Sequence, residues 1–206
     1  MQLSHSNEGN CVVLKLLRIP AMLFFLLCLS NYRLPAPFAQ NTPAEGEMFP
    51  ELKLSMPQKM EQREYLNVDR SPFLLSEVDS EVLIVEIFSM YCPYCQKEAP
   101  NVNALYQAIS ASPEIKSRVK MLGIGAGNTS FEVNAFRDLF RIEFPLIPDA
   151  DFGVHKILGD VHTPYFFVLW KKPAGRQVVY SRVGSIGDPE AFLELVCART
   201  GIDRRK

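Results

Sequence analysis

Two cysteines separated by two residues are the side chains in this sequence best suited to chemistry. Cys92 and Cys95 enclose Pro93 and Tyr94 in the stretch "SMYCPYCQKEAPN". A pair with this spacing serves as a dithiol–disulfide redox couple, as half of a zinc site, or as part of a disulfide framework. The surrounding sequence has to distinguish between these three uses.

The elements predicted around the pair favour redox chemistry. Residues 81–88, "EVLIVEIF", are almost all apolar, which is typical of a strand buried on both faces. Pro93 suits the first position of a helix that begins right after this strand, so we expect Cys92 at the cap. Free backbone amides and the dipole of a helix N-terminus stabilise a thiolate and make Cys92 a nucleophile. Cys95 lies one turn deeper, where a shielded thiol can resolve a mixed disulfide.

A metal site has less support in the sequence. A structural zinc site needs a second Cys or His pair at similar spacing, and the sequence contains none. Of the three histidines, His5 lies near the N-terminus, while His155 and His162 are seven residues apart. A copper site made of both sulfurs and His162 stays open as an alternative.

Further elements follow the cysteine pair in an alternating order. Apolar residues at helical spacing continue the first helix towards Pro113, and a second buried strand is predicted over residues 118–126. Thr129 and Glu132 form a capping box for the next helix. The other predicted elements are a short strand at 63–68, a helix at 131–142, an extended segment at 144–149, a short helix at 151–159, a hairpin of strands at 164–170 and 176–184, and a last helix from 189. This order predicts an α/β fold with helices on both sides of a mixed sheet.

Residues 123–128, "GIGAGN", resemble a dinucleotide-binding loop only superficially. Asn128 stands where the last glycine of that pattern belongs, and no acid suited to a ribose follows at the expected distance. We interpret the stretch as the turn between a strand and a helix. The sequence therefore predicts no cofactor, and a net charge of −1 gives no reason to expect a nucleic-acid partner.

The N-terminal segment is typical of an export signal. Lys15 and Arg18 precede an apolar stretch at residues 19–29, and small residues then lead to Ala39. The apolar stretch is shorter than the roughly 20 residues that a helix needs to span a bilayer. We interpret residues 1–39 as a signal peptide, with an uncleaved membrane tether as the alternative. Either form predicts an exported, periplasmic protein.

The exported part is predicted to contain one domain. Residues 40–57 are rich in proline and lack periodic apolar residues, so we interpret them as a linker that packs at most partly on the domain edge, and residues 58–206 as the domain. Beyond the leader, Cys197 is the one cysteine outside the pair. It lies beside the apolar face of the last predicted helix, as a small buried hydrophobic residue would. So few cysteines are not typical of a disulfide-stapled scaffold.

The segment around the cysteines resembles the active site of the thioredoxin superfamily. "LIVEIFSMYCPYCQKEAP" contains a central strand, a Cys-x-x-Cys motif and, at Pro100, the proline that kinks the following helix in that superfamily. The longer region before "HTP" is most similar to the exported TlpA-like and redoxin branch. The resemblance implies a thioredoxin fold, in which helices flank a mixed central sheet and a β-α insertion precedes the cis-proline strand.

The resemblance also implies roles for individual residues. Thr163–Pro164 matches the superfamily's cis-proline position, where the backbone of Thr163 offers an edge to a substrate chain and Pro164 shields the sulfurs. Glu86 matches a buried acid that takes the proton from Cys95. Cys92 and Cys95 are implied to form the active-site disulfide.

Residues next to the cysteines depart from the thioredoxin pattern. Tyr91 replaces the tryptophan that usually precedes the first cysteine, and Pro93–Tyr94 is the pair familiar from glutaredoxins. We expect these three residues, together with Thr163, to contact the substrate. Because the intervening pair helps to set the stability of the thiolate, these departures leave the redox potential open.

Together these features predict an exported thiol-disulfide oxidoreductase that acts on protein cysteines. The resemblance favours a reductase, for instance in cytochrome c maturation or periplasmic thiol homeostasis, supplied with electrons by a membrane partner of the thiol-disulfide type. A thiol peroxidase is one alternative, since Ser89 fits the peroxidase pattern although Val85 stands where that pattern has a proline. A copper chaperone that uses Cys92, Cys95 and His162 is the other.

Overall fold

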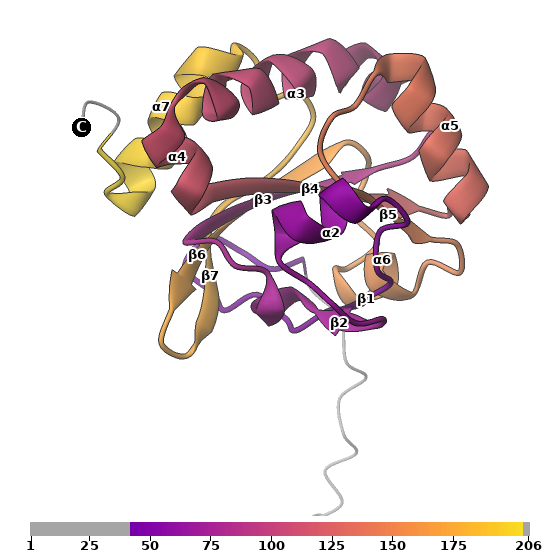
Figure 1. Cartoon of the computed structure of the whole chain (residues 1–206), viewed down its shortest axis with the longest axis horizontal. Helices are drawn as coiled ribbons and strands as arrows, with labels where there is room; N and C mark the ends of the chain where they lie inside the picture. Colours follow the sequence, from indigo (N-terminus) through magenta and orange to yellow (C-terminus); the bar gives the residue numbers. More distant parts are fainter. Residues whose placement is uncertain (1–41, 204–206) are drawn as a thin grey trace, which may run out of the picture. The chain divides into compact units, whose positions relative to one another are not determined.

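A five-stranded mixed sheet forms the centre of the computed structural model, which describes residues 42–203 (Figure 1). The predicted leader at residues 1–39 lies outside this range. The strands, in the order β5-β4-β3-β6-β7, are β3 (Val82–Phe88), β4 (Val119–Ala126), β5 (Leu146–Asp149), β6 (Tyr165–Lys172) and β7 (Gly175–Val183). β3, β4 and β5 are parallel, whereas β6 is antiparallel to β3 and β7 is antiparallel to β6. The predicted mixed sheet is confirmed.

Strand β3 occupies the middle of the sheet because both of its faces are apolar. All of its residues are buried. Ile84 and Phe88 belong to the apolar core on one side of the sheet, and Leu83 and Val85 belong to the core on the other side. A strand with a continuous apolar run is stable only when both faces are covered. The end of β3 therefore has a fixed position, and the chain continues from it to Cys92.

Helices cover both faces of this sheet (Figure 1). One face carries α3 (Pro93–Ala111), α4 (Pro113–Arg118), α5 (Ser130–Phe140) and α7 (Pro189–Thr200). The other carries α2 (Met60–Leu66), α6 (Gly153–Ile157) and a two-stranded sheet of β1 (Lys53–Leu54) and β2 (Phe73–Leu74), which runs into the 3-10 turn η1 (Leu75–Glu77). β5 and α6 form the expected insertion before β6. In residues 42–203 no helix has the length and apolar character needed to cross a membrane.

The described part of the stretch 40–57 packs into the domain, which corrects its interpretation as a linker. Phe49, Leu52 and Leu54 are buried in the core below the sheet. The backbone of Phe49 donates a hydrogen bond to the carbonyl of Arg176 in β7. Its apolar residues show no helical or strand periodicity in the sequence, because the backbone that carries them is almost entirely irregular.

The short strand predicted at residues 63–68 is also corrected, because these residues end helix α2 instead. Most residues of "MEQREYL" are good helix formers, and Leu66 packs into the core. Asn67 ends the helix in the left-handed conformation, with φ at 56°. A six-residue window was too short to distinguish one buried turn of helix from a strand.

Candidate active site

Cys92 lies where strand β3 passes into helix α3. It is the N-cap residue of α3, and Pro93 occupies the first turn, as the sequence predicts. Its half-buried thiol donates a hydrogen bond to the main-chain oxygen of Thr163, with 3.2 Å between Sγ and O. The Thr163–Pro164 peptide bond is cis. The fold thus brings together the first cysteine and the cis-proline segment, which are 71 residues apart in the sequence.

The surroundings of Cys92 favour its thiolate form. Burial by itself would raise the pKa of this thiol, but hydrogen bonds from the side chain of Thr163, from Cys95 and from the backbone of Tyr94 outweigh burial, so that its pKa lies below the ordinary value. Backbone amides in the first turn of a helix supply this kind of stabilisation to an anion. Cys92 is therefore suited to nucleophilic attack.

Cys95 has the opposite character. Its side chain is fully buried, and burial, together with the nearby carboxylate of Glu86, raises the pKa of the thiol far above the ordinary value. Both cysteines of the pair are free thiols in this structure. The disulfide between them stays a prediction. A buried thiol of this kind needs a proton acceptor before it can attack a sulfur.

Glu86 is placed to be that acceptor. It shares its face of β3 with Ile84 and Phe88, and only 3% of the residue is exposed. Burial, and secondarily the negative charge of Glu98, raises the pKa of Glu86 to about 8. A carboxyl group whose pKa lies near neutral pH can both accept and return a proton. Glu86 is buried, as the resemblance implies, and its role as the acceptor of the Cys95 proton stays a prediction.

Glu98 is a site residue that the sequence analysis missed. It lies on α3, is 3% exposed, and accepts hydrogen bonds from the backbone amide of Ile186 at 2.8 Å and from the Asn101 side chain at 3.2 Å. The position of Glu98 in the sequence could have identified it as a buried residue. Glu98 falls three residues after Cys95 and directly before the buried Ala99, so it is an acid on the core-facing side of a helix.

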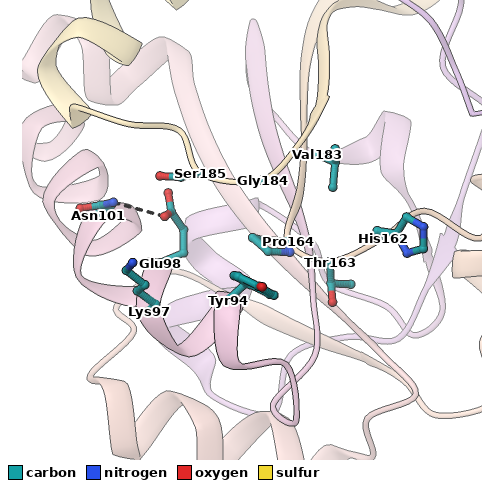
Figure 2. A pocket seen from close by; sticks show the side chains of 10 residues that line it. All are labelled: Tyr94, Lys97, Glu98, Asn101, His162, Thr163, Pro164, Val183, Gly184 and Ser185. Atoms are coloured by element: carbon teal, nitrogen blue, oxygen red, sulfur yellow. Dashed lines mark hydrogen bonds between the residues drawn. The ribbon is translucent and has the colours of Figure 1, made fainter.

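A pocket of about 650 Å³ opens beside the cysteines (Figure 2). Three segments line it: one face of α3, the cis-proline segment, and the end of β7 with the residues that follow. Figure 2 shows Glu98 between α3 and Ser185, with Pro164 in the middle of the pocket. The lining residues are Tyr94, Lys97, Glu98, Asn101, His162, Thr163, Pro164, Val183, Gly184 and Ser185.

The residues around the cysteine pair are exposed, as a substrate-contacting rim requires. Tyr91 is 65% exposed and Tyr94 is 73% exposed, and Pro93 between the cysteines also faces solvent. Exposed aromatic side chains offer a large apolar contact area without a large loss of side-chain entropy on binding. Their contact with substrate stays a prediction.

The structure does not assemble the copper site considered above. His162 lines the pocket, but Figure 2 shows it on the far side of Thr163 from helix α3. Across residues 42–203, no cluster of three or more His, Cys, Asp or Glu side chains has the arrangement of a metal site. Cys197 is buried on α7 within the apolar core, as predicted.

Comparison with known proteins agrees with this geometry. The family model described as "AhpC/TSA family" matches residues 46–182. The thiol-disulfide oxidoreductase ResA of Geobacillus thermodenitrificans is 23% identical over 160 residues, which cover 77% of this chain and 83% of that protein. The ResA of Halalkalibacterium halodurans is 23% identical over 125 residues, 59% of this chain and 66% of the relative. The chain therefore spans just under two-thirds of the second relative.

Solved structures show the same fold. The thioredoxin domain of a thiol-disulfide oxidoreductase from Bacteroides vulgatus superposes with a TM-score of 0.57 at 14% identity, covering 75% of this chain and 99% of that one. StoA from Bacillus subtilis superposes with a TM-score of 0.51 at 18% identity, covering 74% and 98%. The predicted thioredoxin fold is confirmed.

Proposed function

Because the chain belongs to the AhpC/TSA family, in the TlpA-like branch of the thioredoxin superfamily, we propose that it is a thiol-disulfide oxidoreductase acting on protein cysteines through Cys92 and Cys95. The observation that carries this proposal is the contrast between the two thiols. Cys92 is accessible and its pKa is lowered, whereas Cys95 is fully buried and its pKa is raised. Disulfide exchange needs one attacking and one resolving sulfur with these properties.

The reductive reaction has two steps. The Cys92 thiolate attacks one sulfur of a substrate disulfide, that S–S bond breaks, and the other substrate sulfur leaves as a thiolate that takes up a proton. Glu86 then accepts the proton of Cys95, whose thiolate attacks the Cys92 sulfur and releases the second substrate thiol. The substrate gains two electrons and two protons, and the enzyme is left with a Cys92–Cys95 disulfide.

Substrate recognition belongs to the exposed residues around Cys92. We assign substrate contacts to Tyr91, Pro93 and Tyr94 on one side and to the backbone of Thr163 on the other. Pro164 shields the sulfurs from solvent. An extended chain can pair with a free strand edge, so the substrate segment that carries the disulfide is proposed to be extended.

We infer that electrons flow towards the substrate. The support is the resemblance to TlpA-like reductases and the export signal that residues 1–39 resemble. In an oxidising compartment such a reductase has to be reduced again, and we assign this step to a membrane-bound dithiol partner. The opposite direction, disulfide formation in substrates, uses the same residues in reverse.

Trapping the mixed disulfide tests the proposed function. The Cys95→Ser variant, incubated with an oxidised protein such as insulin, is expected to accumulate a covalent complex through Cys92 that dithiothreitol releases. Cys92→Ser is expected to form none, and the matched control Cys197→Ser is expected to reduce insulin at the wild-type rate. Undiminished insulin reduction by Cys92→Ser would refute the assignment.

A thiol peroxidase of the AhpC/TSA type is the second candidate, because the chain matches the family model of that description. In this reaction the Cys92 thiolate attacks a peroxide oxygen, the O–O bond breaks, and the other oxygen leaves as hydroxide or alkoxide and takes up a proton. The sulfenic acid formed on Cys92 is then attacked by Cys95, which displaces water to give the disulfide. Val85, buried in β3, stands where the peroxidase pattern has a proline. Peroxide consumption that requires Cys92 would support this activity. Consumption no faster than the uncatalysed reaction would exclude the peroxidase alternative.

A further inference from the structure

The turn between β4 and α5 contacts the loop that leads into the active site. Asn128 ends this turn and is fully buried. Its side-chain oxygen accepts a hydrogen bond from the backbone amide of Met90 at 2.8 Å, and its side-chain nitrogen lies 3.5 Å from the Ser89 hydroxyl. Ser89 and Met90 stand between β3 and Cys92, so Asn128 holds the chain two residues before the reactive cysteine.

Glu132, on the first turn of α5, makes a second connection to the same loop. One carboxylate oxygen, Oε2, caps α5 by accepting hydrogen bonds from the backbone and hydroxyl of Thr129 at 2.7 Å and 2.8 Å. The other oxygen, Oε1, accepts a hydrogen bond from the hydroxyl of Tyr91. The two oxygens thus have separate tasks, and the second one reaches the residue directly before Cys92.

Close packing keeps this turn in place. Gly127 has a φ of +65°, and a Cβ atom on it would lie 2.2 Å from the ring of Phe152. Its amide donates to the carbonyl of Asp149 at 2.9 Å, which ties the turn to the end of β5. The Asn128 amide donates to Gly125 at 3.0 Å. These contacts fix the position of Asn128 and of the start of α5, which carries Glu132.

We propose that Asn128 and Glu132 are positioning residues for Cys92, because together they hold the three residues that precede it. Neither residue touches the sulfur. They fix where Sγ lies relative to the backbone amides of α3 and the side chain of Thr163, whose hydrogen bonds stabilise the thiolate. The same contacts raise the pKa of Tyr91 and lower that of Glu132. This inference rests on the proposed function, since it gives Cys92 the role of nucleophile.

Alkylation of Cys92 by iodoacetamide, followed over pH in the reduced full chain and localised by mass spectrometry, tests the proposal. Iodoacetamide is too small to need the substrate rim, so the rate reports the thiolate itself. Tyr91→Phe removes only a hydroxyl and leaves the Glu132 charge in place. We expect it, and Asn128→Ala, to raise the apparent pKa of Cys92 and to slow alkylation at pH 7 by roughly threefold to tenfold, the effect of one hydrogen bond.

Two further variants separate positioning from general destabilisation. Tyr65→Phe removes a buried hydroxyl that accepts a hydrogen bond from the Met121 amide at 2.8 Å, remote from this loop. It is expected to lower the melting temperature without changing the alkylation of Cys92. In a double-mutant cycle, Glu132→Ala is expected to add little to the effect of Tyr91→Phe on Cys92, although it also removes the carboxylate half of the α5 capping box.

The possible outcomes distinguish this inference from the proposed function. If wild-type Cys92 alkylates like an ordinary thiol, with no lowered pKa, the proposed function itself fails. If the wild-type pKa is low and Tyr91→Phe leaves it unchanged, the positioning role is overturned and the proposed function stands. Should Asn128→Ala fail to fold, Tyr91→Phe and its cycle with Glu132→Ala decide the question, because the Tyr91 hydroxyl is exposed.

Discussion

The two sulfurs of the site differ in character although only two residues separate them. Cys92 receives hydrogen bonds at the start of α3, which lower its pKa, while Cys95 is fully buried and faces Glu86. Burial and the charge of Glu98 in turn hold the proton on Glu86 to about pH 8. At the scale of residues, the site therefore combines a thiol suited to nucleophilic attack, a buried thiol that keeps its proton and an acid whose pKa is about 8.

We expect Glu86→Gln to slow the second step of exchange and to leave the first step unchanged. Only the deprotonated carboxylate accepts the Cys95 proton, so resolution by the wild type should quicken as pH rises towards 8. The variant should lose this rise and resolve about 100-fold more slowly. Quenched-flow measurement of the mixed disulfide between pH 6 and 9 checks this, and an unaltered profile would speak against Glu86 as the base.

The raised pKa of Glu86 also predicts how stability depends on pH. The folded protein keeps this proton up to about pH 8, whereas the unfolded chain releases it near 4.5. The free energy of unfolding should therefore fall between these pH values, by on the order of a few kcal/mol. Glu86→Gln should remove this part of the slope and exceed the wild type in stability at pH 8. Urea titrations at pH 5, 6.5 and 8, with exposed Glu61→Gln as the control, measure the difference.

At the scale of elements, the sequence predicts what regular patterns determine. The unbroken apolar run of β3, the proline at the start of α3 and the capping box of α5 each correspond to an observed element. The first cysteine and the cis-proline segment were expected to meet only because of the family resemblance, since no local pattern relates them.

The missed features depend on tertiary contacts. Glu98 is a polar residue whose partners, Glu86 and Ile186, come from other elements, so its burial is visible only after folding. Asn128 was interpreted as part of a turn, which is correct. Its side-chain oxygen, however, accepts a hydrogen bond from the backbone of Met90, 38 residues earlier in the sequence. The helix ending at Leu66 was too short to show a periodicity of its own.

The packing of residues 42–57 leads to a prediction at this scale. Leu52 is fully buried, whereas its neighbour Lys53 is exposed. Because this segment packs into the core, Leu52→Ala should leave a cavity there and lower the free energy of unfolding by about 2–5 kcal/mol. Lys53→Ala should change it by less than about 0.5 kcal/mol. Equal, small effects of both substitutions in urea denaturation would mean that the segment acts as a linker.

For the whole molecule, the fold places all parts of the site at one end of the central sheet. β3 supplies Glu86, α3 supplies both cysteines and Glu98, and the start of β6 brings Pro164 to them. The apolar cores on the two faces of the sheet fix the positions of these elements relative to one another. With the proposed function, Cys92 and Cys95 have to act as one redox unit.

The reduction potential of this unit tests that requirement most directly. The protein is equilibrated in dithiol buffers of graded potential, and the oxidation state of each cysteine is determined by alkylation and mass spectrometry. We predict one two-electron transition shared by Cys92 and Cys95, near the thioredoxin value of about −270 mV, with Cys197 reduced throughout. The absence of a reversible two-electron transition at this pair would contradict the account.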